Sequence, residues 1–458
     1  MNKRLVFSVP YGLAFRNIVC CGTLAACHRR ADQVTVLLPE LAREDSAQLL
    51  SELPPDTDVR RMPPIKPSIY FTYLKLLKQH LYARRTALDS FQVKHRSRRQ
   101  QHPLFHHAAV IGERAGELLI PEPTLDRWLA AARQPHEDYY RRLLEDVRAD
   151  AVVIAKPGYM PEELPLIKAA RALRLPTVAV DTTWDNMASK RPPYLRPDAL
   201  TVWNARMSRE AVEYYGFSRA TTTVTGGPQF DIFGQRDRLP AREEFFNRLG
   251  LDPARPLLLF ALNSPAFTPD NQAYVELLVD AIDRNMLKGA PNLVVRLHPW
   301  DRTSDYGALG KRDRLRIERP FGVSNSASVY ECIPSQREVV HYGALMAYAN
   351  VVMNIASTTT LDALAAGAPV VNLAFDLKTV PAALSVTRYY DFTHYRAIID
   401  SGAVHLARSP DELFERLNRH LDDPSLNLER REAARVEFLT YADGRNGERI
   451  ADVINGFC

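Results

Sequence analysis

Polar residues suited to binding a nucleotide diphosphate follow an apolar run in the second half of the chain. Arg296 and His298 close the segment NLVVRLHP, residues 292–299, whose composition is typical of a buried strand. Side chains alternate along a strand, so Arg296 and His298 share one face. Two hydrogen-bond donors, one permanently charged, suit a diphosphate. A histidine satisfied by a neighbouring loop carbonyl is the structural alternative.

Four consecutive hydroxyl residues follow a second apolar run, VVMNIA at residues 351–356. Ser357 or Thr358 is expected to cap a helix that ends at Gly367. The start of such a helix offers backbone N–H groups and a positive dipole end to an anion. Capping accounts for one hydroxyl but not for four. Asp362, in the first turn, is expected to accept from ribose hydroxyls, with compensation of the helix dipole as the alternative.

Asn263 and Ser264 close a third apolar run, residues 256–262, although strand-to-helix loops are commonly rich in these residue types. The predicted nucleotide-binding set is therefore Arg296, His298, Asn263, Ser264, Ser357, Thr358, Thr359 and Asp362.

The first half carries a polar cluster directly after the apolar run TVAVD, residues 177–181. An aromatic, two carboxylates and two cations are crowded into residues 181–191. Asp185 or Asp181 is expected to act as general base on an acceptor hydroxyl, since burial and neighbouring charges tune a carboxylate. An Asx-type turn in which Asp185 caps the next segment is the alternative. His298 completes the predicted catalytic set, where it stabilises charge on the leaving group.

The elements that position these residues alternate between apolar runs and helical segments. The runs are continuously apolar, as expected for parallel strands whose sheet is covered by helices on both faces. They lie at residues 5–11, 34–39, 151–155, 177–181, 199–203, 221–226, 256–262, 292–299, 351–356 and 369–375. The pattern predicts an α/β protein with two doubly wound, Rossmann-like domains facing a central cleft.

The expected boundaries are residues 1–235 for an acceptor domain, 236–435 for a nucleotide-donor domain and 436–458 for a C-terminal helix. A helical, basic insertion is expected at about residues 40–149. Within it, residues 75–99 carry eight Lys or Arg and one Asp, a net charge of +7. A solvated helical face and a surface for anionic lipid or a diphosphate-linked acceptor explain this charge equally well.

The composition is that of an ordinary globular protein, with 458 residues, 46% hydrophobic residues and a net charge of +5. This mild excess gives no reason to expect nucleic acid as a partner. Five cysteines without a CxxC pair fit a reducing compartment. Neither a membrane-spanning run nor a signal peptide is recognisable, so we expect a cytoplasmic protein, with peripheral membrane contact through residues 75–99. GxGxxG and HExxH motifs are absent, and no DxD lies between apolar strands, which predicts a reaction without a metal or a nicotinamide cofactor.

The motifs resemble those of GT-B glycosyltransferases of bacterial surface-polysaccharide (capsule and O-antigen) synthesis, related to CDP-glycerol glycerophosphotransferases and polysialyltransferases. His298-Pro299 and Ser357-Thr358-Thr359 match their HP and Ser/Thr motifs, which the resemblance assigns to the donor phosphates. The segments WDN at 184–186, GGPQFD at 226–231 and DGR at 443–445 match as well. The hydroxyl motif lacks the acidic residue of a glycerophosphotransferase, which favours a sugar donor.

These observations predict a metal-independent glycosyltransferase that moves a sugar from a nucleotide-activated donor to a glycan or lipid-linked acceptor. A UDP-GlcNAc 2-epimerase-like enzyme or a glycerophosphotransferase on the same fold is the alternative, and a noncatalytic binding protein on this scaffold is a third. The base and sugar of the donor, the acceptor and the stereochemistry depend on pocket shape and stay open.

Overall fold

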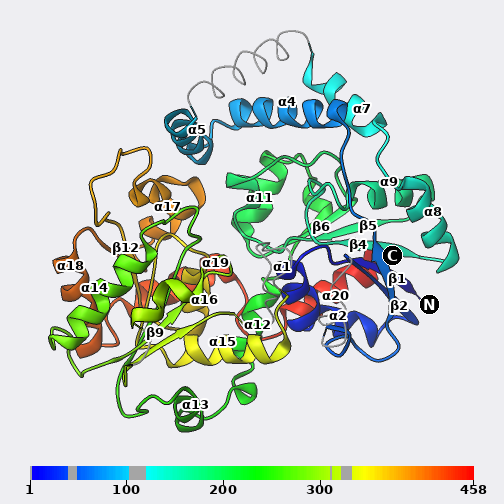
Figure 1. Ribbon diagram of the computed structural model, residues 1–458. Helices are drawn as coiled ribbons and strands as arrows, with labels where there is room; N and C mark the ends of the chain where they lie inside the picture. The colour runs from blue at the N-terminus through cyan, green and yellow to red at the C-terminus, as the bar shows by residue number, and fades with distance from the viewer. Residues whose placement is uncertain (1–2, 40–48, 103–119, 310–311, 321–332, 458) are drawn as a thin grey trace. The chain divides into compact units, whose positions relative to one another are not determined.

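The computed structural model describes residues 3–39, 49–102, 120–309, 312–320 and 333–457. The chain forms two compact units, residues 1–229 with 445–458 and residues 230–444. Each is built around one parallel sheet covered by helices (Figure 1), which confirms the predicted α/β architecture. The boundary lies at 229/230 rather than at the expected 235/236, and the last helix belongs to the first unit.

The first sheet has the strand order β3-β2-β1-β4-β5-β6-β7, and each pairing is parallel. Its order reverses between β1 and β4, which makes the sheet doubly wound. The strands are β1 (Arg4–Ser8), β2 (Gln33–Pro39), β3 (Asp58–Met62), β4 (Ala151–Ile154), β5 (Thr177–Val180), β6 (Ala199–Val202) and β7 (Thr222–Val224). β3 lies inside the region expected to be a helical insertion, because its sequence DVRRM is too polar to be recognised as a strand.

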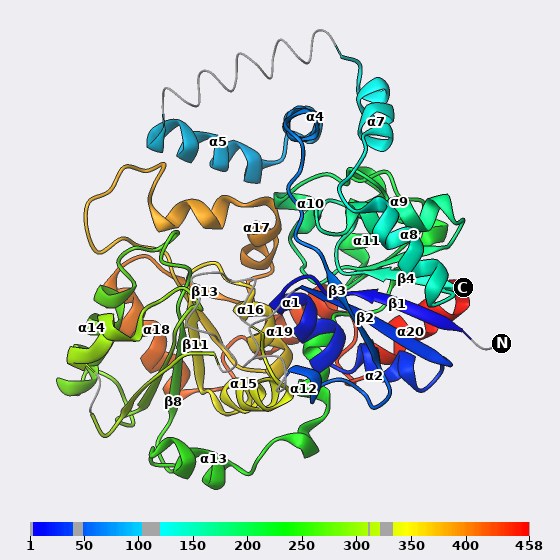
Figure 2. The ribbon, with the colours of Figure 1, turned by 45° about the vertical axis from the view of Figure 1, so that its right-hand side comes forward.

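Helices cover both faces of the first sheet. α2 and α20 lie along one face and α9 and α11 along the other (Figure 2). α4 and α5 form the predicted basic helical segment, and α5 packs against α10. The helices of this unit are α1 (Gly12–Phe15), α2 (Thr23–His28), α4 (Ile69–Thr86), α5 (Asp89–Gln101), α7 (Glu122–Ala131), α8 (Glu137–Asp146), α9 (Leu164–Ala172), α10 (Asn186–Ser189), α11 (Ala205–Glu213) and α20 (Asn446–Phe457).

The second sheet repeats the same winding, with the order β10-β9-β8-β11-β12-β13 and its reversal between β8 and β11. The strands are β8 (Leu257–Ala261), β9 (Asn292–Arg296), β10 (Leu315–Glu318), β11 (Val351–Asn354), β12 (Val370–Leu373) and β13 (His405–Ala407). The helices are α12 (Asp231–Gly234), α13 (Arg242–Leu249), α14 (Asn271–Asp283), α15 (Gln336–Tyr348), α16 (Thr359–Ala366), α17 (Thr393–Asp400), α18 (Pro410–Asp422) and α19 (Leu428–Leu439).

Alternate residues of the four central strands pack against α14 and α18 to form the core of the second unit. Leu258, Val295 and Met353 are fully or almost fully buried there, with Leu278 of α14 and Leu417 of α18. In the part of the chain that the structure describes, no helix is both long and apolar enough to cross a membrane.

The C-terminal helix α20 docks closely onto α2. A Cβ at Gly447 would lie 3.0 Å from the backbone nitrogen of Thr23 and 3.2 Å from the carbonyl oxygen of Cys21. Asn446 also donates from its side chain to the carbonyl of Gly227 at 3.0 Å. This close approach fixes the end of the chain to the first sheet.

We therefore expect Gly447→Val to lower the free energy of unfolding of the first unit by about 1–3 kcal/mol, because the added methyl groups overpack the α2–α20 contact. Gly456→Val is the matched control on the same helix, since a Cβ there meets nothing within 4 Å. Urea unfolding followed by tryptophan fluorescence measures the difference. An equal effect of both substitutions would contradict the tight contact.

Candidate functional site

The predicted nucleotide-binding residues of the second unit follow three adjacent strands. Asn263 and Ser264 come after β8, His298 after β9 and Ser357 after β11. In the sheet these strands lie in the order β9-β8-β11, which includes the reversal of strand order. Ligands of doubly wound sheets bind outside the carboxyl ends of the strands at this reversal. The fold therefore brings the three predicted loops to one edge.

His298 is held as a neutral hydrogen-bond donor. Its backbone N–H donates to Asp301 Oδ2 at 2.9 Å, and its ring Nδ1 accepts from the backbone N–H of Trp300 at 3.2 Å. Burial lowers the pKa of His298 to about 4. Because Nδ1 accepts, the single ring proton of the neutral form lies on Nε2. The side chain can thus donate from Nε2 to an anion without carrying a charge.

A buried hydrogen-bond chain ties the loops after β8 and β9 together. The Asn271 side chain donates to the carbonyl of Asn263 at 2.8 Å and to Asp301 Oδ1 at 3.4 Å. Tyr306 donates to the same carboxylate oxygen at 3.2 Å. Asn263 in turn donates from its amide to the carbonyl of Ile355 at 3.3 Å, just after β11. Asn263 therefore connects all three loops.

The hydroxyl residues after β11 are arranged around the start of α16. Ser357 donates from its backbone N–H to the side-chain oxygen of Asn354 at 3.1 Å, and its Oγ accepts the N–H of Thr359 at 3.3 Å. Thr358 occupies the N-cap position without a side-chain capping bond. Thr360 is buried against the Tyr395 hydroxyl at 2.7 Å. Ser357 thus makes the local bond expected of a cap, and Thr360 belongs to the core.

Two other residues of the predicted nucleotide-binding set already have side-chain partners inside the second unit. Arg296 is 6% exposed and forms ion pairs with Glu338 and, at 3.6 Å, with Glu318. Asp362 is buried and accepts from the Tyr342 hydroxyl at 2.9 Å. These contacts give both residues a structural role, so we do not assign the donor phosphates or the ribose to them.

The predicted catalytic residue Asp181 is enclosed at the end of β5. It is 1% exposed and accepts from the backbone N–H of Thr183 at 3.2 Å and from the side-chain amide of Asn186. Tyr159 in turn donates to Asn186 Oδ1 at 2.6 Å. Burial raises the pKa of Asp181 to about 6, against the attraction of the Lys156 ammonium. Asp181 orders the loop that follows β5.

Asp185, the other predicted base, is more accessible, with 19% of its side chain exposed. It forms an ion pair with Lys190 at 2.9 Å and accepts from the Ser189 hydroxyl at 3.0 Å. Asp185 stands at the N-cap position of α10 without a side-chain capping bond, which does not support the alternative of an Asx-type turn capped by Asp185. Its carboxylate is held at the edge of the first sheet by side chains.

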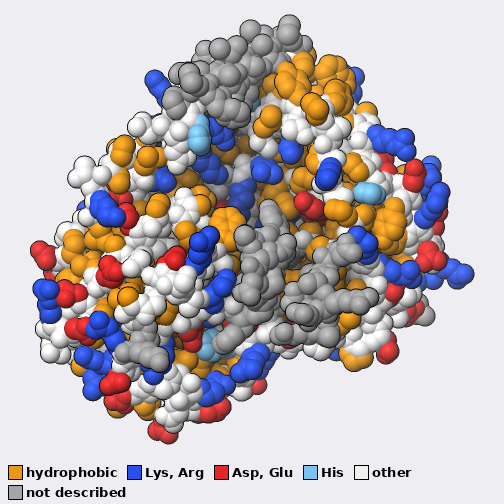
Figure 3. All heavy atoms as spheres, in the orientation of Figure 1, with side chains coloured by type: hydrophobic (Ala, Val, Ile, Leu, Met, Phe, Trp, Pro, Cys, Tyr) orange, Lys and Arg blue, Asp and Glu red, His pale blue; other side chains and the backbone are white. Residues whose placement is uncertain are grey.

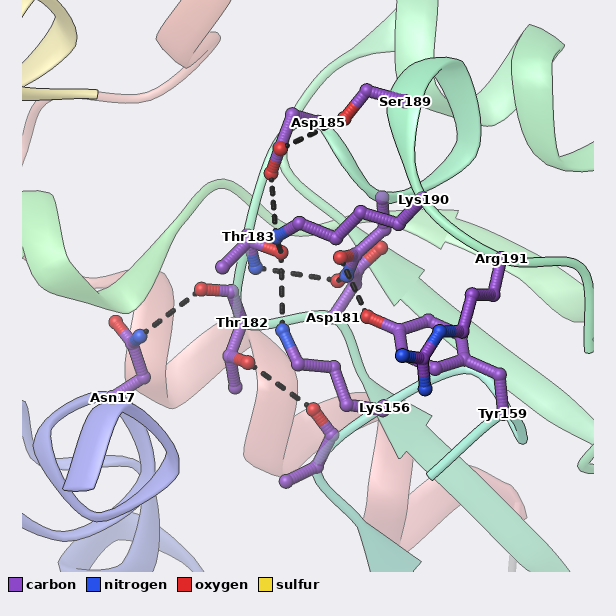
Figure 4. Close-up of polar contacts among 12 residues, drawn as sticks. Asn17, Lys156, Tyr159, Asp181, Thr182, Thr183, Asp185, Ser189, Lys190 and Arg191 are labelled. Atoms are coloured by element: carbon purple, nitrogen blue, oxygen red, sulfur yellow. Dashed lines mark hydrogen bonds and ion pairs between the residues drawn. The ribbon is translucent and has the colours of Figure 1, made fainter. Parts of the chain in front are cut away.

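Lys156 is a functional candidate that the sequence analysis did not identify. It is 4% exposed at the end of β4, and its Nζ donates to Thr183 Oγ1 at 3.0 Å (Figure 4). Burial lowers the pKa of Lys156 to about 7. The turn after it requires glycine, because Gly158 has a φ of 86° and a Cβ there would lie 1.8 Å from the carbonyl oxygen of Leu195. The signal available in the sequence was a lysine directly after a buried apolar run.

A second unpredicted group, Glu163, lies beside the same strand. It is fully buried, and its Oε1 accepts the backbone N–H of Ala155 at 2.7 Å. Burial raises the pKa of Glu163 to about 8. The region after β4 and β5 therefore carries three buried groups, Lys156, Asp181 and Glu163, whose pKa values burial shifts toward neutral pH. Such groups cluster at functional sites more often than elsewhere.

No protein-family model matches the chain, and no curated protein matches its sequence. Solved structures do match its fold. A UDP-GlcNAc 2-epimerase from Neisseria meningitidis bound to UDP-GlcNAc is 12% identical with a TM-score of 0.58, and all of each chain is covered. A UDP-GlcNAc 2-epimerase from Methanocaldococcus jannaschii is 11% identical with a TM-score of 0.55 and the same coverage. The glycotransferase of kitacinnamycin is 12% identical with a TM-score of 0.51, and 99% of each chain is covered. At these identities the likeness shows the fold, which is GT-B.

The raised pKa of Glu163 predicts a pH dependence of stability. A glutamate in the unfolded chain titrates near 4.5, so the folded protein keeps a proton that the unfolded chain releases. Stability is therefore lost as the pH rises between these two pKa values, by up to about 1.4 kcal/mol per pH unit. Glu163→Gln keeps the oxygen that accepts from Ala155 but cannot titrate. Urea unfolding across this range should give a flatter pH profile for the variant, and identical slopes would rule out the buried proton.

Proposed function

We propose that this chain is a nucleotide-sugar enzyme whose second unit binds the nucleotide diphosphate at the carboxyl ends of β8, β9 and β11. The hydrogen-bond chain through Asn271, Asp301 and Asn263 carries this proposal. It holds the loops of three strands in fixed positions at the point where doubly wound sheets bind ligands. Preorganised donors of this kind stabilise negative charge without reorganisation during the reaction.

His298 Nε2 and the hydroxyl of Thr359, which itself accepts from the Ser357 hydroxyl at 3.1 Å, are the donors that we assign to the diphosphate. The start of α16, where both hydroxyl residues lie, adds the positive end of a helix dipole. A neutral histidine donor makes this contact independent of pH above the pKa of about 4. Charge that develops on the departing diphosphate is then stabilised by hydrogen bonds and the dipole.

Two reactions are compatible with this site. The comparisons favour a reaction of the UDP-GlcNAc 2-epimerase type, because enzymes with that name match the fold over the whole chain. Inversion at a sugar carbon requires bond breaking and re-formation there, for which proton-exchanging groups such as Lys156 are suited. Transfer to an acceptor is favoured by Asp185, whose partly exposed carboxylate is placed to accept a proton from a hydroxyl.

Incubation with UDP-GlcNAc alone, without an acceptor, tests the function and separates the two reactions. We expect bound UDP-GlcNAc to be converted to the C2 epimer if the first reaction is correct, and to be bound without epimer formation if the chain is a transferase. His298→Ala should weaken nucleotide binding at least tenfold, equivalent to about 1.4 kcal/mol. Calorimetry and chromatography of the nucleotide sugars provide the measurements.

His405→Ala is the matched control for the nucleotide site. His405 lies on the edge strand β13, and its Nε2 contacts the Asn427 amide at 2.8 Å, so its loss should leave nucleotide binding unchanged. Failure of UDP and the other nucleoside diphosphates, CDP and GDP, to bind the wild-type protein would refute the proposed function. Equal binding by wild type and His298→Ala would refute the assigned site.

We also propose that α4 and α5 contact an anionic membrane surface. The charges of Lys78 and Arg85 are compensated within the protein, since both residues form ion pairs with Glu122. The exposed part of the segment nevertheless combines cations with apolar side chains, the composition of an interfacial helix. Figure 3 shows hydrophobic side chains over α4 and α7 and basic side chains over α4 and α5. The exposed apolar residues of α4 are Ile69, at 91%, with Tyr70, Tyr73 and Leu76.

Co-sedimentation with lipid vesicles tests the membrane contact. We expect binding to vesicles that contain phosphatidylglycerol, weaker binding to pure phosphatidylcholine, and a loss of at least tenfold in Ile69→Ser/Leu76→Ser, because both side chains would leave the bilayer interface. Phe457→Ser, at an exposed position of α20, is the control. Wild-type affinity in the double variant would exclude α4 as the contact.

A further inference from the structure

The exposed aromatic rings of the second unit lie in the loops of its candidate site. Among the described residues of this unit, Phe267 and Trp300 are the exposed aromatic side chains, at 52% and 44%. Phe267 lies in the loop after β8 and Trp300 in the loop after β9. Single exposed apolar residues are common on protein surfaces. Trp300 differs from them because it lies two residues after His298, in a loop whose conformation is fixed.

A tight turn holds Trp300 beside His298. The backbone N–H of Asp301 donates to the carbonyl of His298 at 2.8 Å, which closes a β-turn with Pro299 as its first central residue. Proline suits this position because its φ is already fixed. The carbonyl of Pro299 also accepts from Arg319 at 3.1 Å, and the backbone N–H of Trp300 donates to the His298 ring. The position of Trp300 relative to His298 is therefore set before a ligand binds.

The indole of Trp300 and the imidazole of His298 are in contact. Their ring centroids are 5.6 Å apart, with an angle of 67° between the ring planes, an edge-to-face arrangement. Trp184 and Trp203, by contrast, are buried in the first unit. An indole that stays nearly half exposed forgoes part of the free energy that burial provides. A fixed, exposed ring beside a proposed phosphate-binding group has the arrangement of a platform on which a planar ligand group stacks.

We propose that Trp300 stacks on the nucleobase of the nucleotide whose diphosphate contacts His298. This inference rests on the proposed function, to which it adds the position of the base. One ribose joins the base to the diphosphate, so a base on Trp300 and a phosphate on His298 Nε2 can belong to the same nucleotide. A base has a π-face and gains stacking energy from an indole, whereas a sugar ring has no π-face. Since every base has such a face, Trp300 adds affinity for nucleotides without selecting one base.

Two substitutions separate stacking from apolar bulk. Trp300→Phe keeps an aromatic face, and Trp300→Leu keeps an apolar side chain without one. Calorimetry with UDP should show binding weakened by about tenfold in Trp300→Leu and by no more than about threefold in Trp300→Phe. UDP-GlcNAc should show the same ratios, because it carries the same base. Melting temperatures verify that each variant is folded.

Tryptophan fluorescence provides a second measurement. The chain has four tryptophans, and Trp128 of α7 in the first unit is exposed to a similar extent, at 41%. A base stacked on Trp300 should quench its fluorescence. We expect UDP to quench the fluorescence of the wild type and of Trp128→Phe, the matched control, but not that of Trp300→Phe. Trp128→Phe should also bind UDP with wild-type affinity.

Each contrary outcome has a distinct meaning. UDP binding that is weakened by His298→Ala but unchanged in Trp300→Leu would overturn the stacking and leave the proposed function standing. Equal losses in Trp300→Phe and Trp300→Leu would overturn it too, and so would quenching that persists in Trp300→Phe. A loss confined to UDP-GlcNAc would assign Trp300 to the sugar instead of the base. Failure of the wild type to bind any nucleoside diphosphate would refute the proposed function, and the stacking with it.

Discussion

The candidate site of the second unit depends on one constraint. Polar groups that are buried at the carboxyl edge of its parallel sheet must find hydrogen-bond partners, and this requirement sets the positions of the loops. A polar side chain that is buried without a partner costs about 1–3 kcal/mol. Asp301 is 6% exposed and meets this requirement by accepting from the His298 backbone, from Tyr306 and from Asn271. Because its donors come from different segments, satisfying one carboxylate fixes two loops at once. The position of His298 is thus a consequence of packing around Asp301.

The same constraint acts on charges in the first unit, with a different outcome. Lys156 is buried against the Thr183 hydroxyl and the ring of Tyr11, 5.4 Å from its Nζ. The attraction of Asp181, Asp185 and Glu163 opposes the change, but burial lowers the pKa of Lys156 to about 7. Glu163 and Asp181 are shifted in the opposite direction by the same cause. Desolvation therefore brings the protonation equilibria of three groups toward neutral pH at one edge of the sheet.

The sequence predicted the fold well because continuous apolar runs identify buried parallel strands. It also identified the strand-end loops at His298, Asp181 and Ser357, since the winding of each parallel sheet brings the carboxyl ends of its strands to one edge. The sequence did not predict the side-chain interactions between segments that lie far apart along the chain. Arg296 is neutralised by ion pairs with Glu318 and Glu338. The sequence around Arg296 gives no indication of these partners, because both lie far from it along the chain. Lys156 was missed for a related reason, because its significance depends on Thr183, which lies in the loop after the neighbouring strand β5.

A shared fold does not decide between epimerisation and transfer, so the choice depends on which side chain a substrate can reach. Asp181 is 1% exposed; its Oδ1 accepts from Thr183 and Asn186, and its Oδ2 is buried without a hydrogen-bond partner among the described residues. A substrate hydroxyl could reach this carboxylate only by opening the loop that Asp181 orders. Asp185 has 19% of its side chain exposed and forms an ion pair with Lys190 at 2.9 Å. Of the two carboxylates that the sequence could not rank, Asp185 is the more accessible and is therefore the one that we propose as the base, while Asp181 keeps its loop in position.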